Sequence, residues 1–215
     1  MKDDEGKQVI AEQIEKLESW TPPTRSRLGR NTDNTKDFYQ WYQPKCDAMK
    51  QEVLSGKLTA QQTQEARRQI NLFLRRCQKY LVLEQNGCHY IEQVEDEKGY
   101  TEEHLIPQNL LIDAYIDGLL SFNDVLCMPM VKLSNRSDKL LQEEGLGTKT
   151  PSWKNPFERY IQAGIESEFV TQHNYRVNIH AWSLEKHFEM VEQTKKNFDK
   201  LQQDSMLTDH KNMLL

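Results

Sequence analysis

Long apolar runs are absent from this sequence: no stretch approaches the roughly 20 apolar residues that a membrane-spanning helix needs. The first residues, Met-Lys-Asp-Asp-Glu-Gly, contain nothing like the apolar stretch of a signal peptide. We therefore expect a soluble protein of the cytoplasm.

Cysteine is scarce and shows no metal-binding spacing. The four cysteines are Cys46, Cys77, Cys88 and Cys127. They form no Cys-x-x-Cys motif and have no histidine at zinc-finger spacing. We interpret them as reduced thiols.

Motifs of common enzyme classes are also missing, since there is no glycine-rich phosphate loop and no Gly-x-Ser-x-Gly sequence. His173, His180 and His187 recur every seven residues, but no His-x-x-x-His or Glu-x-x-His pair supports a metal site. Asp113 and Asp117 lie four residues apart on an expected helix, where two carboxylates can act together, yet nothing complements them. We expect no enzymatic activity, no metal and no cofactor.

Acidic residues are missing from residues 66–83, although the chain has a formal net charge of −5. At about 100° per residue, the apolar side chains of this segment form one arc, which predicts an amphipathic helix. The arc consists of Ala66, Ile70, Phe73, Leu74, Cys77 and Leu81. The cations are Arg67, Arg68, Arg75, Arg76 and Lys79. We expect all five on the opposite side, facing solvent or an anionic partner.

Cations on one rigid helix face can neutralise nucleic-acid phosphates, and arginine can bind a phosphate through two hydrogen bonds. A second segment without acids, residues 19–32, contains Arg25, Arg27 and Arg30 near several aromatic residues. This segment could bind single-stranded nucleic acid by charge and stacking, as an auxiliary arm. A solvated linker is the alternative.

Basic residues are in turn rare in the segment that follows the basic helix. Residues 84–124 hold ten Asp or Glu against one Lys, a local balance of −9. This acidic segment is close enough along the chain to neutralise the basic helix internally. The basic face therefore has three interpretations: a solvated or internally neutralised face, a nucleic-acid site, or a site for an acidic protein.

Proline, glycine and hydrophobic periodicity divide the chain into elements. The expected helices span residues 7–20, 37–54, 60–85, 107–120, 123–144, 156–170 and 183–203. Asn86-Gly87 predicts a β-hairpin within residues 80–105, where residues 96–99 are a second candidate turn. Alternation over residues 175–182 predicts a half-buried strand. We expect a mainly α (α+β) fold: a helical domain with one or two small β-hairpins or strands and amphipathic helices at both termini.

A basic helix followed by a hairpin resembles the recognition helix and wing of winged-helix DNA-binding domains. The resemblance covers only this order of elements. No helix-turn-helix break precedes the basic helix, and Glu84 and Glu92 in the expected wing would repel phosphate.

We expect three parts: an N-terminal helix and basic linker (1–36), a helical core domain with a small β element (37–182), and a C-terminal amphipathic helix and tail (183–215). The leading hypothesis is a non-enzymatic intracellular protein that binds DNA or RNA, or works in a nucleoprotein complex, through the basic helix and the linker arginines. The alternative is an adaptor or regulatory protein that self-associates or docks a partner through its terminal helices and acidic segment. The seam expected on the C-terminal helix consists of Leu184, Phe188, Val191, Phe198 and Leu201.

Overall fold

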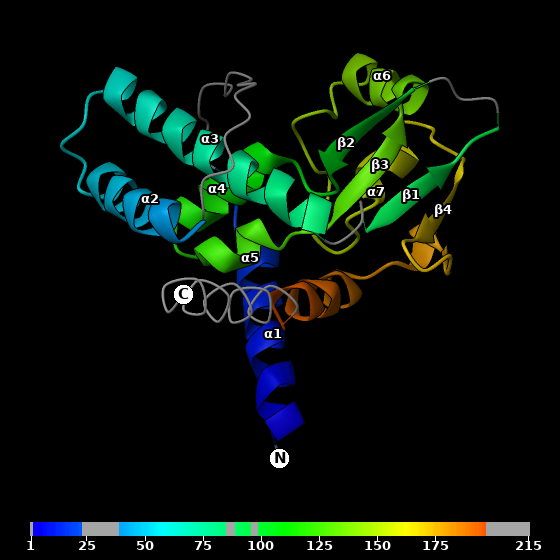
Figure 1. Ribbon diagram of the computed structural model, residues 1–215, viewed down its shortest axis with the longest axis horizontal. Coiled ribbons are helices and arrows are strands. Elements are labelled where there is room, and N and C mark those ends of the chain that lie inside the picture. Colours follow the sequence, from blue (N-terminus) through cyan, green and yellow to red (C-terminus); the bar gives the residue numbers. More distant parts are fainter. Residues whose placement is uncertain (1, 23–38, 85–88, 96–98, 197–215) are drawn as a thin grey trace, which may run out of the picture.

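The computed structural model describes residues 2–22, 39–84, 89–95 and 99–196 of the chain. Four helices gather at one end of the molecule and a sheet lies at the other end (Figure 1). Helix α1 (Lys2–Ser19) and a final helix, residues 184–196, lie beside both parts. Among the described residues, no helix is long and apolar enough to span a membrane.

The first helices follow the sequence pattern closely. Helix α2 spans Tyr39–Leu54 and α3 spans Ala60–Glu84. Thr59 caps α3: its hydroxyl accepts from the Gln62 amide at 3.2 Å, and the Gln62 side chain accepts from the Thr59 amide at 2.9 Å. This reciprocal pair satisfies amides that the first turn of a helix leaves without partners.

Helix α4 (Gln108–Ile116) lies at the centre of the helical part. Pro107 precedes it, at a position where a missing amide proton costs nothing. Every residue from 110 to 116 is buried, because α3 and α5 (Phe122–Leu126) pack around this helix. The apolar core here includes Ile70, Leu74, Leu111, Ile112, Tyr115 and Val125.

The strands form one five-stranded mixed sheet. They are β1 (Tyr90–Gln93), β2 (Tyr100–His104), β3 (Met130–Ser134), β4 (Glu168–Thr171) and β5 (Arg176–Val177). Their order across the sheet is β2-β3-β1-β4-β5, and β1 and β3 run parallel while the other pairs are antiparallel. Helical content thus predominates as expected, but the β structure is one sheet and not separate small hairpins.

The predicted hairpin around Asn86-Gly87 is wrong, because its first arm belongs to α3, which continues to Glu84. The Asn86-Gly87 pair itself lies outside the described residues. Strands β1 and β2 flank the second candidate turn, but they do not pair with each other, since β3 lies between them. The resemblance to a winged helix depended on this hairpin after α3, so the structure does not support it.

Two of the predicted helices each conceal a strand. Residues 123–144 divide into the end of α5, strand β3 and helix α6 (Asn135–Glu143). Residues 156–170 divide into α7 (Glu158–Gln162) and the start of β4. The predicted strand at 175–182 shortens to β5, and a 3-10 turn, Ile179–Ala181, follows it.

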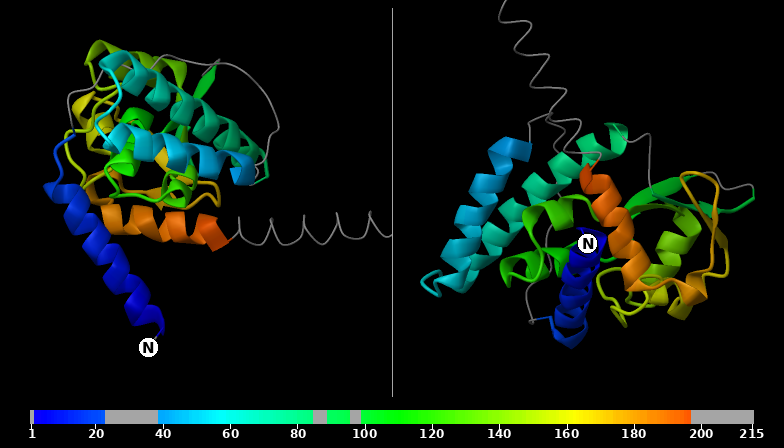
Figure 2. Two further views of the ribbon diagram at one scale, coloured as in Figure 1. Left: turned by 90° about the vertical axis from the view of Figure 1, so that its left-hand side faces the viewer. Right: turned by 90° about the horizontal axis from the view of Figure 1, so that it is seen from below.

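Both terminal helices pack into the helical core. Leu17 of α1 is fully buried there, together with Leu184, Phe188 and Val191 of the final helix. Asp124 joins the two helices: its carboxylate accepts from the Gln13 side chain at 3.2 Å and forms an ion pair with Lys195. Figure 2 shows the two helices crossing on the same side of the molecule.

Candidate nucleic-acid interface

Arg67 corrects the expectation that all five cations of α3 face outward. Its side chain is buried, with Nη2 2.6 Å and Nε 3.1 Å from Oδ1 of Asp113 on α4. Arg67 and Leu74 are seven residues apart, almost two full turns, so they lie on the same side of the helix. Arg67 therefore belongs to the edge of the apolar arc and is not available to bind nucleic acid.

Beside its apolar residues, the side of α3 that faces α4 and α5 also carries buried polar side chains. Gln78 donates to the carbonyl of Val125 at 2.9 Å and accepts from Gln108 at 3.3 Å. Arg75 is exposed, but its Nε donates to the same Gln108 side chain at 2.9 Å. This polar contact between helices was not predicted, because each partner on α4 or α5 is distant in sequence.

Arg68 and Arg76 extend from the outer side of α3. Arg68 forms an exposed ion pair with Glu65 one turn away, with Nη2 2.6 Å from Oε1. Hydrogen bonds from Arg68 and Gln69 lower the pKa of Glu65 to about 2. An exposed pair of this kind contributes little stability, so phosphate can compete with the Glu65 carboxylate for Arg68.

A cation from α2 lies beside Arg76. The rings of Tyr42 and Phe73 stack with centroids 4.5 Å apart, and Lys45 Nζ lies over both, at 5.8 Å and 5.9 Å. Arg76 donates to the Tyr42 hydroxyl at 3.4 Å. The aromatic pair therefore supports cations from two helices along the line where the helices meet.

We name these cations the α2–α3 cation face and define it by Lys45, Arg68, Arg75 and Arg76. Arg75 lies at the edge toward α4, where it donates to Gln108. Lys79 belongs to α3, but its side chain lies outside the described residues. Arg25, Arg27 and Arg30 also lie outside them. Of the eight residues predicted to bind nucleic acid, Arg68, Arg75 and Arg76 have an outward or partly outward position. Arg67 is buried and no longer belongs to the candidate site. Lys45 belongs to it but was not predicted from the sequence.

Charge is concentrated around this face. Residues 39–79 contain eight Lys or Arg against three Asp or Glu, a formal charge of +5 in a chain of −5, so the remaining residues carry −10. Removing the buried Arg67 leaves +4 on residues 39–79, a segment that includes Lys57 in the loop between α2 and α3. A local excess of this size attracts polyanions even when the whole chain is acidic, because salt screens charges beyond about 10 Å.

Where the structure describes them, the residues of the acidic segment 84–124 are dispersed through the fold and do not lie across α3 as one block. Asp113 pairs with Arg67, but Glu103 pairs with Arg159 and Asp124 pairs with Lys195. Glu92 is buried at the start of α6, where it accepts from the Ser134 amide and the Ser137 hydroxyl, each at 2.6 Å. The acidic segment thus neutralises one cation of the basic helix, Arg67, through Asp113.

The second candidate site, Asp113 with Asp117, does not present two carboxylates to solvent. Asp113 is buried against Arg67, and Asp117 accepts from the indole nitrogen of Trp20 at 3.1 Å. The two aspartates fix α4 to α3 and to the end of α1.

The repeated histidines do not form a common site. His173 and His180 are exposed, whereas His187 is fully buried. In the part of the chain that the structure describes, no group of three or more His, Cys, Asp or Glu side chains is arranged to hold a metal ion.

His187 is one of three buried histidines, with His89 and His104. The His89 Nδ1 accepts from the Met130 amide at 3.2 Å, so Nε2 carries the proton and donates to the Thr194 hydroxyl at 3.0 Å. Burial lowers the pKa of His89 to about 4. Burial lowers the pKa of His187 to about 3, with a smaller contribution from His89. Burial also lowers the pKa of His104 to about 3, with smaller contributions from Arg75 and Arg159.

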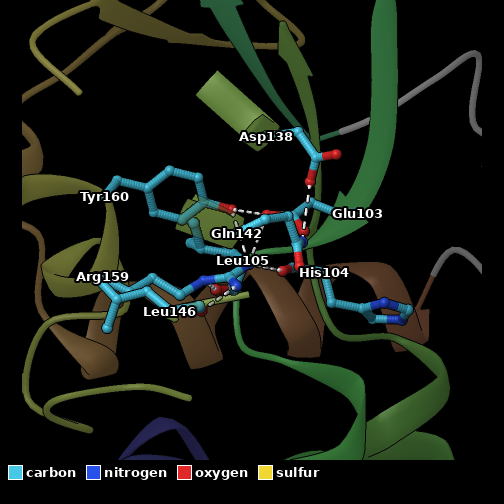
Figure 3. A network of polar contacts seen from close by, with 8 residues as sticks. All are labelled: Glu103, His104, Leu105, Asp138, Gln142, Leu146, Arg159 and Tyr160. Carbon is cyan, nitrogen blue, oxygen red and sulfur yellow. Dashed lines mark hydrogen bonds and ion pairs between the residues drawn. The ribbon is translucent and has the colours of Figure 1, made fainter. Parts of the chain in front are cut away.

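A buried network at Arg159, which no sequence pattern indicates, connects α7 to the end of β2 (Figure 3). The Arg159 guanidinium lies 2.6 Å from Glu103 and 3.0 Å from the Tyr160 hydroxyl, which itself donates to Glu103 at 2.8 Å. The Arg159 guanidinium also donates to the carbonyls of His104, Leu105 and Leu146. These bonds satisfy the guanidinium internally, so we interpret the network as a structural connection.

Comparison with known proteins adds no family to this description. No protein-family model matches the chain, and neither a curated protein nor a solved structure matches it.

Proposed function

We propose that the protein is a non-enzymatic nucleic-acid-binding protein, or a component of a nucleoprotein complex, which holds DNA or RNA against the α2–α3 cation face. The observation that supports this most directly is the position of Lys45 beside the Tyr42–Phe73 ring pair, with Arg76 bonded to the Tyr42 hydroxyl, in a segment, residues 39–79, that carries +5. Contact with the rings fixes the exposed Lys45 at low entropic cost, while its charge can still contact phosphate.

Arg25, Arg27 and Arg30 are proposed as an auxiliary arm. They lie in the segment that leads directly into α2, so the sequence tethers further positive charge to the same pair of helices. Binding of this kind would take place inside the cell, and we propose a cytoplasmic location.

The alternative of an adaptor protein has less support. Three residues of the proposed C-terminal seam, Leu184, Phe188 and Val191, are already buried in the core of the chain itself. A partner would have to displace the final helix to reach them. We therefore include polyglutamate, at the same salt, beside the nucleic acids of the test as a substitute for an acidic protein.

The test is binding of labelled single- and double-stranded DNA and RNA, followed by fluorescence anisotropy over a range of salt concentrations. The variant removes the charges of the α2–α3 cation face by Lys45→Gln, Arg68→Gln, Arg75→Gln and Arg76→Gln. Arg67 is left unchanged, because its substitution would disturb the core. We expect the wild type to lose affinity with salt and the variant to flatten the log–log slope by roughly 0.9 for each duplex phosphate contact removed.

The matched control removes the same total charge elsewhere. Its substitutions are Arg136→Gln, Lys139→Gln, Lys149→Gln and Arg176→Gln, all at exposed positions. Circular dichroism must show that both variants fold. Absence of salt-dependent binding by the wild type, or equal losses in the variant and the control, would reject the proposed site.

A further inference from the structure

The final helix, residues 184–196, contacts both parts of the protein at once. In the right-hand view of Figure 2 it lies over the boundary between the helical part and the sheet. The described residues of its apolar seam are buried in the core of the helical part. The residues that face the sheet lie three or four positions apart, on one side of the helix. They are His187, Met190 and Thr194.

Two residues at the start of β1 receive this side of the helix. The Tyr90 ring lies parallel to the His187 ring, with centroids 6.4 Å apart and planes within 8°. The Tyr90 hydroxyl donates to Met190 Sδ at 2.8 Å. His89, which precedes β1, donates from Nε2 to the Thr194 hydroxyl at 3.0 Å. The contact between helix and sheet therefore contains two histidines.

His187 has no hydrogen bond that explains its burial. Its side chain is fully buried, and neither ring nitrogen has a hydrogen-bond partner among the described residues. A neutral imidazole carries one donor and one acceptor, and most buried polar groups in folded proteins have partners. Both nitrogens gain water as partners when the helix leaves this contact, so the buried imidazole favours release over docking.

The surroundings of His187 disfavour a proton on the docked helix. Charged residues beside it along the helix are exposed: Glu185, Lys186 and Glu189. Burial, with a smaller contribution from His89, lowers the pKa of His187 to about 3. The Tyr90 hydroxyl stays neutral, because burial raises its pKa. On a released helix the imidazole would have an ordinary pKa of about 6.5.

His89 is buried in the same contact but is held by the sheet. Its Nδ1 accepts from the Met130 amide of β3, so a proton at this nitrogen would remove that bond. The bond joins two parts of the sheet and does not involve the final helix. Release of the helix alone therefore leaves His89 neutral until β1 and β3 separate.

The opposite side of the helix is held by the ion pair of Lys195 with Asp124. Lys195 also pairs with Glu192 on the same helix. Burial alone would raise the pKa of Asp124, but the bonds from Lys195 and Ser121 lower it below its ordinary value. The Asp124 carboxylate therefore keeps its charge above about pH 5, where the protonation of a released His187 changes.

We propose that the final helix is an acid-sensitive strap, which leaves the rest of the protein with uptake of one proton at His187 while the strands stay paired. Below about pH 6.5 the released helix holds this proton and the docked helix does not. The ratio of released to docked helix therefore rises about ten-fold per pH unit, and about thirty-fold between pH 6.5 and pH 5.

The release is local, because the chain before the helix has its own bond to the sheet. The Trp182 indole donates to the Tyr90 hydroxyl at 3.1 Å, and this bond does not depend on the final helix. Release uncovers the apolar seam that docking buries. None of these residues belongs to the α2–α3 cation face, so the inference does not depend on nucleic-acid binding.

Hydrogen exchange of the full chain between pH 7 and pH 5 tests the proposal. The rates are expressed as protection factors, which remove the pH dependence of chemical exchange. Amides of residues 188–196 report release, because a helix without tertiary packing is marginal in water. We expect their protection to fall about ten-fold per pH unit below about pH 6.5, while amides of β1 and β3 remain better protected. Equal protection of helix and strands, or no fall with pH, would overturn the proposal.

Two variants separate the histidines. His187→Phe keeps a ring beside Tyr90 and cannot titrate, so the protection of residues 188–196 should lose this pH dependence. His89→Gln keeps an acceptor for the Met130 amide and a donor for the Thr194 hydroxyl, so the ten-fold dependence should remain. Circular dichroism at pH 7 checks that both variants fold.

The number of protons decides the assignment even without the variants. A fall of about a hundred-fold per pH unit in the wild type would mean that both histidines take up protons, and would overturn the assignment to His187 alone. The same ten-fold fall in His187→Phe would also overturn it. Loss of the fall in His89→Gln would place the proton on His89 instead.

Discussion

Arg67 and Asp113 form an ion pair in the interior of the protein, with Nη2 2.6 Å from Oδ1 and side chains 3% and 4% exposed. The pair joins the N-terminal half of α3 to the middle of α4.

Replacing Arg67 alone should destabilise the fold strongly. We expect Arg67→Met to lower the free energy of unfolding by about 3 to 5 kcal/mol, because it leaves the Asp113 carboxylate buried without this guanidinium. The double variant Arg67→Met with Asp113→Leu should recover most of this loss, since both charges are then removed. Urea denaturation measures both. If the double variant is as unstable as the single one, the ion pair does not explain the effect.

Stability should fall in mildly acidic solution because of the buried histidines. His187 has a folded-state pKa of about 3, below the usual value of about 6.5 in an unfolded chain. Between these values the unfolded chain binds a proton that the folded chain does not. Each such histidine therefore lowers stability by about 1.4 kcal/mol for each pH unit below about 6.5.

The variant His187→Phe should make stability less dependent on pH. It keeps a ring beside Tyr90, whose plane is within 8° of the imidazole, and removes one of the groups that titrate. Urea denaturation between neutral pH and about pH 4 should give a shallower decline than in the wild type. His180→Gln, at an exposed position, is the control and should leave the decline unchanged.

Asp124 should hold both terminal helices to the core. Its carboxylate accepts from Gln13, pairs with Lys195 and accepts from the Ser121 amide at 2.7 Å in a capping box. Burial alone would raise its pKa, but the bonds from Lys195 and Ser121 lower it. We expect Asp124→Ala to cost about 2 kcal/mol, from the lost cap and the half-buried ion pair.

Hydrogen exchange locates this effect. Amides of α1 and of residues 184–196 should exchange faster in Asp124→Ala, while those of the sheet should change little. Glu166→Ala, which removes an exposed carboxylate, serves as the control. Faster exchange spread evenly over the molecule would show general destabilisation instead of a local release of the terminal helices.

Lysine should not replace Arg159. The guanidinium bonds three carbonyls, the Glu103 carboxylate and the Tyr160 hydroxyl (Figure 3), and a lysine ammonium has three donors on one atom. We expect Arg159→Lys to cost at least about 2 kcal/mol, because buried acceptors lose their partners. Tyr160→Phe removes one hydroxyl and should cost about 1 kcal/mol. Equal losses in thermal or urea unfolding would contradict this ranking.

Elements with a strong local signal could be predicted from the sequence. Helices α1 to α4 have apolar periodicity together with local signals such as Thr59 and Pro107 at their ends, and the structure has them close to the expected bounds. Strand β3 was missed because Met130–Ser134 is short and lies beside residues of helical periodicity. Its pairing with β1, some 40 residues earlier, has no local signature.

The candidate site could be predicted only in part, because only some of its residues have a local sequence signal. The periodicity of α3 identifies an outer side, and Arg68 and Arg76 extend from it. The seven-residue spacing from Arg67 to Leu74 could have shown that Arg67 lies next to the apolar arc. Lys45 could not have been found in this way, because its position over Phe73 depends on how two helices pack.

The meeting of the terminal helices at Asp124 affects the order in which a nascent chain can fold. Gln13 leaves the ribosome early, its partner Asp124 more than a hundred residues later, and Lys195 later still. Strand β1 is synthesised before both of its neighbours in the sheet, so its two edges can pair only after β3 and then β4 have been made. Synthesis must therefore be almost complete through residue 195 before α1 has its full set of neighbours, and until then the apolar side of α1 is a surface on which a chaperone could act.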